Sequence, residues 1–377
     1  MQLDFSFSRT NHTFWGQWLW TTDLISLFAT LILMGFGTLL IMAASPAVAH
    51  TYGYGTFFFF KKHLFFTLLA LGLLFSVSHM SLVTLRRTAF VGFALCLLLL
   101  WATLLLGTPI KGAKRWLSLM GLQLQPSELL KPCFVIVVAW LLSESKRLTG
   151  HFQGQRLCVL LACFTVVPLL LQPDIGMTFG VVVVFVIQLF LGGLSYLLLL
   201  GSGLLGAIAF LAAFFCFPHV RHRLESFLYP ELGNPFGDQF QTLQALSAIQ
   251  KGGWFGVGLG EGTVKLNLPD AHTDFIFAVA AEEFGLLFCV TLLGLYALII
   301  ARAFWHALNA QSLFKTLAIS GLASCLAVQV SVNVASVLGL IPTKGMPLPF
   351  ISYGGSSMLS SALIMAFLLA FTRKRFY

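Results

Sequence analysis

The chain has 377 residues, of which 58% are hydrophobic and only 9% are charged. This composition excludes a soluble globular protein, which could not bury so much apolar surface and would carry more charge. The formal net charge of +9 does not indicate nucleic-acid binding, because no soluble domain is present to carry a basic patch. Basic chain ends beside anionic lipid headgroups explain it better.

Apolar runs long enough to cross a bilayer recur along the whole sequence. Each must be helical, because lipid offers backbone polar groups no other partner. We therefore predict an all-α polytopic membrane protein, a single transmembrane domain over 1–377, with about ten spans. The predicted spans are 22–45, 63–80, 88–107, 127–143, 156–171, 175–193, 195–217, 274–301, 313–340 and 350–371.

The distribution of charge predicts the orientation in the membrane. An even number of spans places both termini on one side, and the bases of "LRR" (85–87), "ESKRL" (144–148) and "FTRKRFY" (371–377) indicate that this side is cytoplasmic. The long stretch 218–273 is then an extracytoplasmic loop. Most acids fall on the outer side or in the outer parts of spans, so we expect the chemistry there: Glu128, Asp174, Glu225, Glu231, Asp238, Glu261, Asp270, Asp274, Glu282 and Glu283.

The connection 108–126 and the start of the fourth span carry charges that need a reason. In "GAKRWLSLMGLQLQPSELLKP" (112–132), Pro126 suits the first turn of a helix. Glu128 and Lys131 are then three residues apart on one face, close enough to pair. The pair is interpreted either as a structural ion pair between spans or, through Lys131 or Arg115, as part of a site for an anionic ligand. The two interpretations are compatible.

Two later motifs have simpler interpretations. Asp174 in "LQPDIG" (171–176) stands between two spans and is predicted to cap the sixth helix. The glycines of "GGWFGVGLGEG" (252–262) alternate without the spacing or the lysine of a nucleotide-binding loop. They are expected to let the backbone approach a headgroup or another loop closely.

The stretch "LPDAHTDFIFAVAAEEFG" (268–285) places acids at the mouth of the eighth span and inside it. Ionisable groups within a membrane usually face a cavity or a counter-charge and mark function. Thr273 or Asp274 could simply cap the helix. Asp274 could also stay ionised and reach water and a lipid-linked substrate, as a general base must. Glu282 and Glu283 are adjacent, point about 100° apart and are expected to face different partners.

These residues resemble the SEDS family (shape, elongation, division and sporulation), which includes FtsW and RodA. The signature is "IPTKGMPLPFISYGGSS" (341–357), preceded in order by "GAKRWL…QPSELLK", "QPDIG", "FQTLQALSAIQKGGWFGVGLGEGTVK" and "LPDAHTDFIFAVAAEEFG". Gln329 and Asn333 also match the run into the signature. The "PTKG" run looks more like the division-type branch, FtsW, than RodA. The chain departs from the family pattern at Asn234, Phe240, Asp270 and Ser336.

The resemblance implies a peptidoglycan glycosyltransferase, which polymerises lipid II at the outer face of the bacterial cytoplasmic membrane, during cell division. It implies that Asp274 of the His-Thr-Asp motif is catalytic and that Glu128 and Lys131 form the family's Glu–Lys pair. Arg115, Lys131, Lys265 or a divalent cation, Mg²⁺ or Mn²⁺ with ligands not assigned, could stabilise the departing diphosphate. The remaining residues predicted to bind substrate are His272, Thr273, Lys344 and Ser352.

The resemblance also implies partners and leaves rivals. We expect a class B penicillin-binding transpeptidase, other division proteins and membrane lipids as partners, no nucleic acid, and a location at the division site. The rivals are a lipid II flippase, since intramembrane charges also occur in transporters, an elongation-type polymerase like RodA, and a non-catalytic scaffold. A flippase would need groups that alternate between the two faces, whereas these acids cluster on one.

Overall fold

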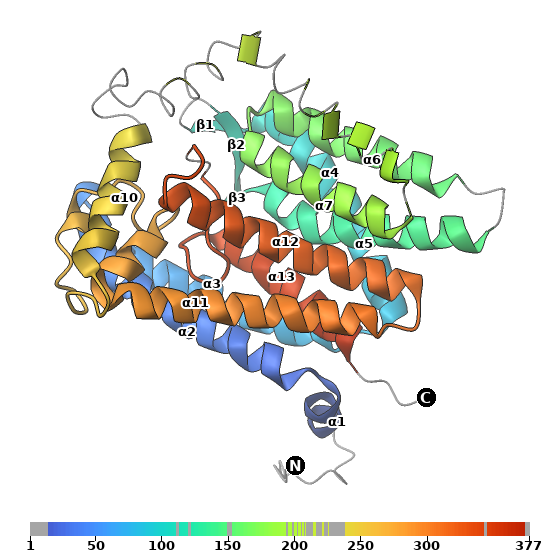
Figure 1. Cartoon of the computed structure of the whole chain (residues 1–377), viewed down its shortest axis with the longest axis horizontal. Coiled ribbons are helices and arrows are strands. Elements are labelled where there is room, and N and C mark those ends of the chain that lie inside the picture. The colour runs from blue at the N-terminus through green and yellow to red at the C-terminus, as the bar shows by residue number, and fades with distance from the viewer. Residues whose placement is uncertain are drawn as a thin grey trace.

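The computed structural model describes residues 14–110, 113–119, 122–148, 153–193, 195–197, scattered positions between 200 and 225, 238–342 and 345–373. Within this part the chain is a bundle of apolar helices that run side by side (Figure 1). They are α2 (Leu24–Thr51), α3 (Phe58–Ser78), α4 (Leu82–Leu106), α5 (Pro126–Arg147), α6 (Gly154–Leu171), α7 (Ile175–Leu191), α11 (Ile276–Leu308), α12 (Leu313–Val337) and α13 (Gly355–Thr372). The described part also includes α1 (Phe14–Thr21), α10 (Asp238–Gly252) and the 3-10 helix η2 (Val264–Leu266).

Eight of the described helices are long and apolar enough to cross a membrane, and α7, with 17 residues, is a shorter apolar helix. Nine of the ten predicted spans therefore coincide with a helix, which confirms a polytopic helical membrane protein. About half of the tenth, 195–217, lies outside the described residues, and so do all but two residues of 218–237 in the predicted loop 218–273. The number of spans and the side on which the termini lie stay predictions.

The helices differ in how far they are enclosed by protein. α5, α12 and α13 are largely buried, whereas α3, α4, α6 and the second part of α11 expose apolar side chains as lipid-facing helices do. The central helices α12 and α13 carry many small residues, such as Ser320, Ser324, Ser357 and Ser361, all of them buried. Small side chains let helix backbones approach closely, which is how helices associate without a hydrophobic driving force in lipid.

Helices α5, α7, α11 and α13 all begin at one end of the bundle, where α10 also lies beside α11 (Figure 1). We call this end the α10 end. It carries a small antiparallel sheet of β1 (Thr108–Ile110), β2 (Ala113–Leu119) and β3 (Leu122–Leu124), in the order β1-β2-β3. The sheet is a small addition to the predicted all-α membrane fold, which the helices confirm. It places Arg115 on β2, just before α5.

Helix α11 is broken at Gly285, whose φ of 81° and ψ of 179° lie outside the helical range. The glycine-rich segment after α10 pairs with the break: Val257 N donates to Glu282 O at 2.9 Å and Leu286 N donates to Gly253 O at 2.9 Å. A Cβ atom on Gly256 would overlap the carbonyl group of Glu283. The glycines therefore permit a close backbone approach, as predicted, but their partner is the broken helix and not a headgroup or another loop.

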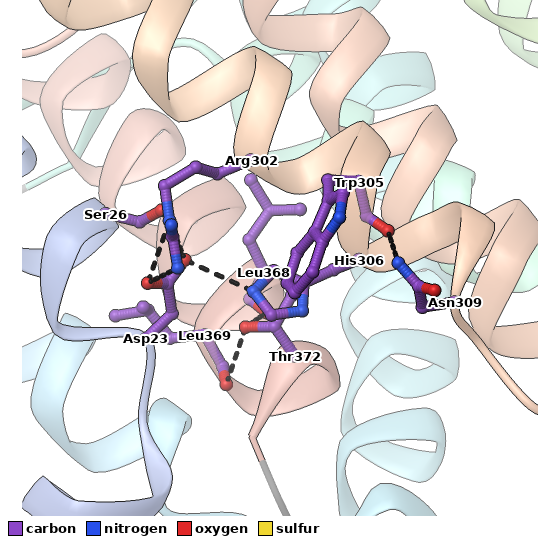
Figure 2. Close-up of polar contacts among 9 residues, drawn as sticks. All are labelled: Asp23, Ser26, Arg302, Trp305, His306, Asn309, Leu368, Leu369 and Thr372. Atoms are coloured by element: carbon purple, nitrogen blue, oxygen red, sulfur yellow. Dashed lines mark hydrogen bonds and ion pairs between the residues drawn. The ribbon is translucent and has the colours of Figure 1, made fainter.

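At the opposite end of the bundle, Asp23 joins the start of α2 to the last turns of α11 (Figure 2). Its carboxylate accepts three hydrogen bonds from Arg302, at 2.7 to 3.1 Å, and one from Ser26 at 2.6 Å. Nε2 of His306 lies 3.5 Å from Asp23 Oδ2. Burial by itself would raise the pKa of Asp23, but the hydrogen bonds from His306, Arg302 and Ser26 outweigh it and hold that pKa well below its usual range.

Candidate active site

The segment that carries Asp274 lies against the segment 345–353 that leads into α13. Tyr353 N donates to the carbonyl oxygen of His272 at 2.8 Å, and Ser352 Oγ donates to that of Thr273 at 2.6 Å. Ser352 Oγ in turn accepts from Leu348 N at 2.7 Å. These bonds fix the backbone before α11. Ser352 was predicted to bind substrate, but here its hydroxyl group makes hydrogen bonds within the protein.

Asn333 of α12 completes this attachment. Its Nδ2 donates to the carbonyl oxygen of Asp274 at 2.9 Å and to that of Met346 at 2.7 Å. The carboxylate of Asp274 is half-buried, and a Cβ atom on Gly345 would come within 3.4 Å of its Oδ2. The absence of a side chain at position 345 therefore leaves room beside the carboxylate.

Neither Thr273 nor Asp274 is the N-cap residue of α11. The position directly before the helix is occupied by Phe275, which has no side-chain acceptor, and Thr273 Oγ1 donates to Asp270 O at 3.1 Å. Thr273 and Asp274 therefore lie one or two residues before the N-cap position and not at it. Asp274 nevertheless lies two residues before the first residue of α11, Ile276, and the dipole of the helix favours a negative charge near its N-terminus.

His272 belongs to an aromatic cluster at the same end. Its ring lies 4.5 Å from that of Phe59 at the start of α3, and 5.3 Å from that of Tyr353. The imidazole is buried in this stack. His272 therefore packs inside the protein and helps to position the segment before α11. Thr273 follows it in that segment.

Glu128 and Lys131 form the predicted pair, with Lys131 Nζ 2.8 Å from Glu128 Oε2, and both side chains are buried. Lys131 Nζ also donates to Gln329 Oε1 at 3.1 Å. Gln329 Nε2 donates in turn to Pro347 O at 2.9 Å. The pair is thus connected, through Gln329, to the segment that is attached to Asp274.

Gln329 and Asn333 are four residues apart on α12, so they project from one face of the helix. Gln329 reaches Lys131 and Pro347, while Asn333 reaches Asp274 and Met346. Gln329 and Asn333 thus hold the adjacent signature residues Pro347 and Met346. The same two side chains contact Lys131 and Asp274, respectively. The sequence indicated Gln329 and Asn333 only as part of the family resemblance, and their bridging role could not be read from it.

Arg115 and Asp174 form a second pair at the α10 end. Arg115 Nε lies 3.6 Å from Asp174 Oδ2, and the guanidinium group donates to the carbonyl oxygens of Gln172 at 3.3 Å and Pro173 at 2.6 Å. Asp174 accepts a hydrogen bond from Met177 N at 3.3 Å, which confirms the predicted cap of this helix, α7. The arginine side chain remains 28% exposed and can be reached from outside.

The electrostatics connect the two pairs. Burial raises the pKa of the Asp174 carboxyl group above its usual range, although Arg115 and the Met177 amide act in the opposite direction. The charges of Glu128 and Lys131 act on the same carboxyl group. The two ion pairs therefore lie within electrostatic reach of one another and form one polar region.

Lys265, Glu282 and Glu283 do not join this region. Lys265 Nζ is buried, is paired with Glu283, and donates to the carbonyl oxygens of Ala43 at 3.2 Å and Gly260 at 3.3 Å. Glu282 accepts from the backbone amides of 263, 264 and 265 at 2.7, 2.8 and 3.0 Å. The two acids do reach different atoms, as predicted, but those atoms belong to one segment, and the interactions are structural. The predicted role of Lys265 in binding substrate receives no support.

Two further predictions find no test among the described residues. Lys344 lies outside them. No group of three or more His, Cys, Asp or Glu side chains that could hold a metal ion occurs in the described part of the chain, so the ligands of the predicted Mg²⁺ or Mn²⁺ ion stay unassigned.

The fold and the site define an α-helical multi-pass membrane protein with a buried polar region at one end of its helices. The family model described as "Cell cycle protein", for FtsW, RodA and SpoVE, matches residues 24–376. The chain belongs to this family of proteins of the bacterial cytoplasmic membrane.

Relatives and solved structures agree with this assignment. The chain is 39% identical over 371 residues to the "Probable peptidoglycan glycosyltransferase FtsW" of Caulobacter vibrioides, covering 98% of this chain and 94% of the relative. It is 31% identical over 357 residues to the stage V sporulation protein E of Bacillus subtilis, covering 93% and 97%.

Among solved structures, a chain of a peptidoglycan synthase complex that coordinates polymerization and crosslinking has a TM-score of 0.76 at 31% identity, covering 93% of this chain and 97% of that one. The rod shape determining protein RodA of Thermus thermophilus has a TM-score of 0.69 at 28% identity, covering 93% and 96%. The fold of the described residues is therefore shared along nearly the whole chain.

Proposed function

We propose that this protein is a peptidoglycan glycosyltransferase that polymerises lipid II, with Asp274 as the general base. The observation that carries the proposal is the arrangement on α12, where Gln329 and Asn333 connect the buried Lys131 and the half-buried Asp274 to neighbouring residues of one segment. A base and a cation held at one end of membrane helices suit a substrate whose reacting groups lie at the headgroup level. The names of the relatives support the same activity.

The reaction needs a base and a stabilised leaving group. A hydroxyl oxygen of the acceptor sugar attacks the anomeric carbon of the donor, and Asp274 takes the hydroxyl proton as the new C–O bond forms. The bond between that carbon and the diphosphate oxygen breaks, and its electron pair leaves with the lipid diphosphate. The partly exposed Arg115 and the buried Lys131 are the cations proposed to stabilise the departing negative charge.

The divalent cation expected from the resemblance remains a prediction without assigned ligands. A Mg²⁺ ion shared with a diphosphate keeps several waters and needs only one or two carboxylates. The proton transfer to Asp274 and the stabilisation by Arg115 and Lys131 need only side chains of this protein.

The α10 end is proposed to face the outside of the cell, where the polymer is assembled. A division-type role is supported by the relatives named FtsW. A penicillin-binding transpeptidase as partner is supported by the similarity to a chain of a complex that joins polymerization to crosslinking. Location at the division site and other division proteins as partners follow from the same proposal.

Purified protein tests the activity when it is supplied with labelled lipid II and Mg²⁺ or Mn²⁺, with and without the transpeptidase. Asp274→Asn should lower polymer formation at least about 100-fold, the usual effect of losing a general base. Glu261→Gln, an equal charge change on an exposed loop residue, is the control and should keep wild-type activity. Equal polymer from Asp274→Asn would remove this residue from its role, and lipid transfer across vesicles without polymer would establish a flippase instead.

A further inference from the structure

Large apolar side chains are exposed on the segment 252–260, between α10 and η2. Trp254 is 65% exposed, Phe255 is 82% exposed and Leu259 is 50% exposed. An exposed aromatic pair next to a membrane-spanning helix is costly in water and favourable at a lipid surface. Within the described residues no other part of the protein covers these three side chains, so an apolar environment outside the protein is needed to bury them.

The position of this segment is fixed by backbone contacts with the break in α11. Leu287 N donates to Trp254 O at 3.3 Å, and Gly258 N donates to Glu283 O at 3.0 Å. These bonds place Trp254 beside Leu286 and Leu287, which are themselves exposed apolar residues of α11. The exposed aromatic pair is thus continuous with the lipid-facing surface of a spanning helix.

The depth of the segment follows from the length of α11 beyond the break. From Leu286 to Leu308 the helix has 23 residues (308 − 286 + 1). At about 1.5 Å per residue this is roughly 34 Å, close to the thickness of a bilayer's hydrocarbon core of about 30 Å. If α11 spans the core with this part, the break and the segment lie at the boundary between acyl chains and headgroups, where Trp is enriched.

The charge beside the segment suits the same boundary. Lys251, at the end of α10, keeps 39% of its side chain exposed while it lies 3.7 Å from Glu282 Oε1. A basic side chain at this level is attracted to anionic headgroups, while its stem covers apolar surface.

We propose that residues 252–260 form an interfacial anchor that seats Trp254 and Phe255 in the phospholipid leaflet at the α10 end, at the level of the glycerol groups and first methylenes. The anchor is joined to the segment before Asp274, because Glu282 holds the amides of 263–265 next to it. It therefore sets the depth at which that segment meets the membrane. The inference rests on the membrane-spanning fold and not on the proposed reaction.

Fluorescence quenching tests the depth of Trp254 directly. The full chain and its Trp254→Phe variant are placed in phosphatidylglycerol–phosphatidylethanolamine vesicles with a spin label at carbon 5 or carbon 16 of the acyl chain. The chain has 8 Trp residues, so the difference between the two spectra isolates Trp254. We expect this difference signal to be quenched at least twofold more by the label at carbon 5 than by that at carbon 16, and little by aqueous iodide.

Trp305, which is exposed in the last turns of α11 at the opposite end, provides the reference through Trp305→Phe. Its difference signal shows that the vesicles report a lipid-facing tryptophan. Quenching of Trp254 by iodide and not by lipid would show that the segment stands in water and would overturn the proposal. Protection from both quenchers would show that protein covers it, and protection that requires the transpeptidase would assign the surface to that partner. Either result would also overturn the proposal.

Discussion

Asn333 and Gln329, both on α12, connect Lys131 of α5 with the segments that precede α11 and α13. Asn333 donates to the carbonyl oxygens of Met346 and Asp274. Gln329 donates to the carbonyl oxygen of Pro347 and accepts a hydrogen bond from Lys131 Nζ. A hydrogen bond from a buried amide contributes modestly to stability, but leaving its partners unsatisfied costs about 1–3 kcal/mol. Their loss should lower polymer formation by more than this loss of stability explains, because the two side chains determine where Asp274 lies.

Asn333→Leu should therefore lower both stability and polymer formation. It removes the donor shared by Asp274 O and Met346 O while keeping a similar volume. We expect a loss of about 1–3 kcal/mol in the free energy of unfolding and at least a tenfold loss of activity. Thermal unfolding and polymerisation are measured beside Ser331→Ala, an exposed change on the same helix. Activity that falls no further than stability explains would show that Asn333 does not position the base.

The buried pair Glu128–Lys131 allows a structural role to be separated from a catalytic one. Lys131→Met leaves a buried carboxylate without its cation and should cost about 3–5 kcal/mol. Adding Glu128→Gln removes that unpaired charge and should restore much of the stability. Under the proposed mechanism polymer formation stays low in the double variant, because the positive charge for the diphosphate is gone. Recovery of activity together with stability would show that the pair is only structural.

At the scale of elements, the break in α11 explains the glycine-rich segment and the two buried acids that precede the break. The segment 252–258 pairs with the broken turn, and Glu282 and Glu283 hold the residues that follow it. Sequence periodicity showed that the two acids diverge, but it could not show which segment returns to meet them. The small sheet was missed for a related reason, because its strands of three to seven residues are too short to carry a clear alternation.

Gly256→Ala tests this packing. Gly256 has a φ of 82°, and a Cβ atom there would overlap the backbone of Glu283. Gly260 has a similar φ of 86°, with nothing within 4 Å of a Cβ atom. Both alanine variants should lose about 1–2 kcal/mol from the left-handed backbone conformation. Only Gly256→Ala should lose considerably more, measured by thermal unfolding in detergent. Equal losses in the two variants would contradict the close pairing with α11.

At the scale of the whole molecule, the apolar runs and the ordered family motifs were enough to predict the helical bundle, Asp274 near the mouth of α11 and the cap at Asp174. The tertiary bonds decided the rest. In the structure Lys265 pairs with Glu283, Phe275 is the residue before α11, and Asn333 connects Asp274 to Met346. Such choices depend on which helices become neighbours, and that information is spread over the whole chain.

The cluster at the opposite end makes stability depend on acid. The pKa of Asp23 is held below its usual value in the folded protein, so its interactions are fully present above the unfolded pKa of about 3.9 and are lost as the pH falls. Asp23→Asn should lower stability at pH 7 by about 1.5–3 kcal/mol, since hydrogen bonds to a charged group are lost. The variant should also lose less stability than the wild type between pH 5 and pH 3. An unchanged slope below about pH 4 would show that Asp23 is not the group responsible.

If Asp274 acts on the proton and not on substrate binding, one variant should separate substrate binding from polymer formation. Lipid II binding and single-turnover polymer formation are compared between wild type and Asp274→Asn in the same vesicles. Binding should stay within about threefold of wild type, while polymer formation should slow at least about 100-fold. Unchanged polymer formation, or a loss of activity fully matched by a loss of binding, would contradict this role of Asp274.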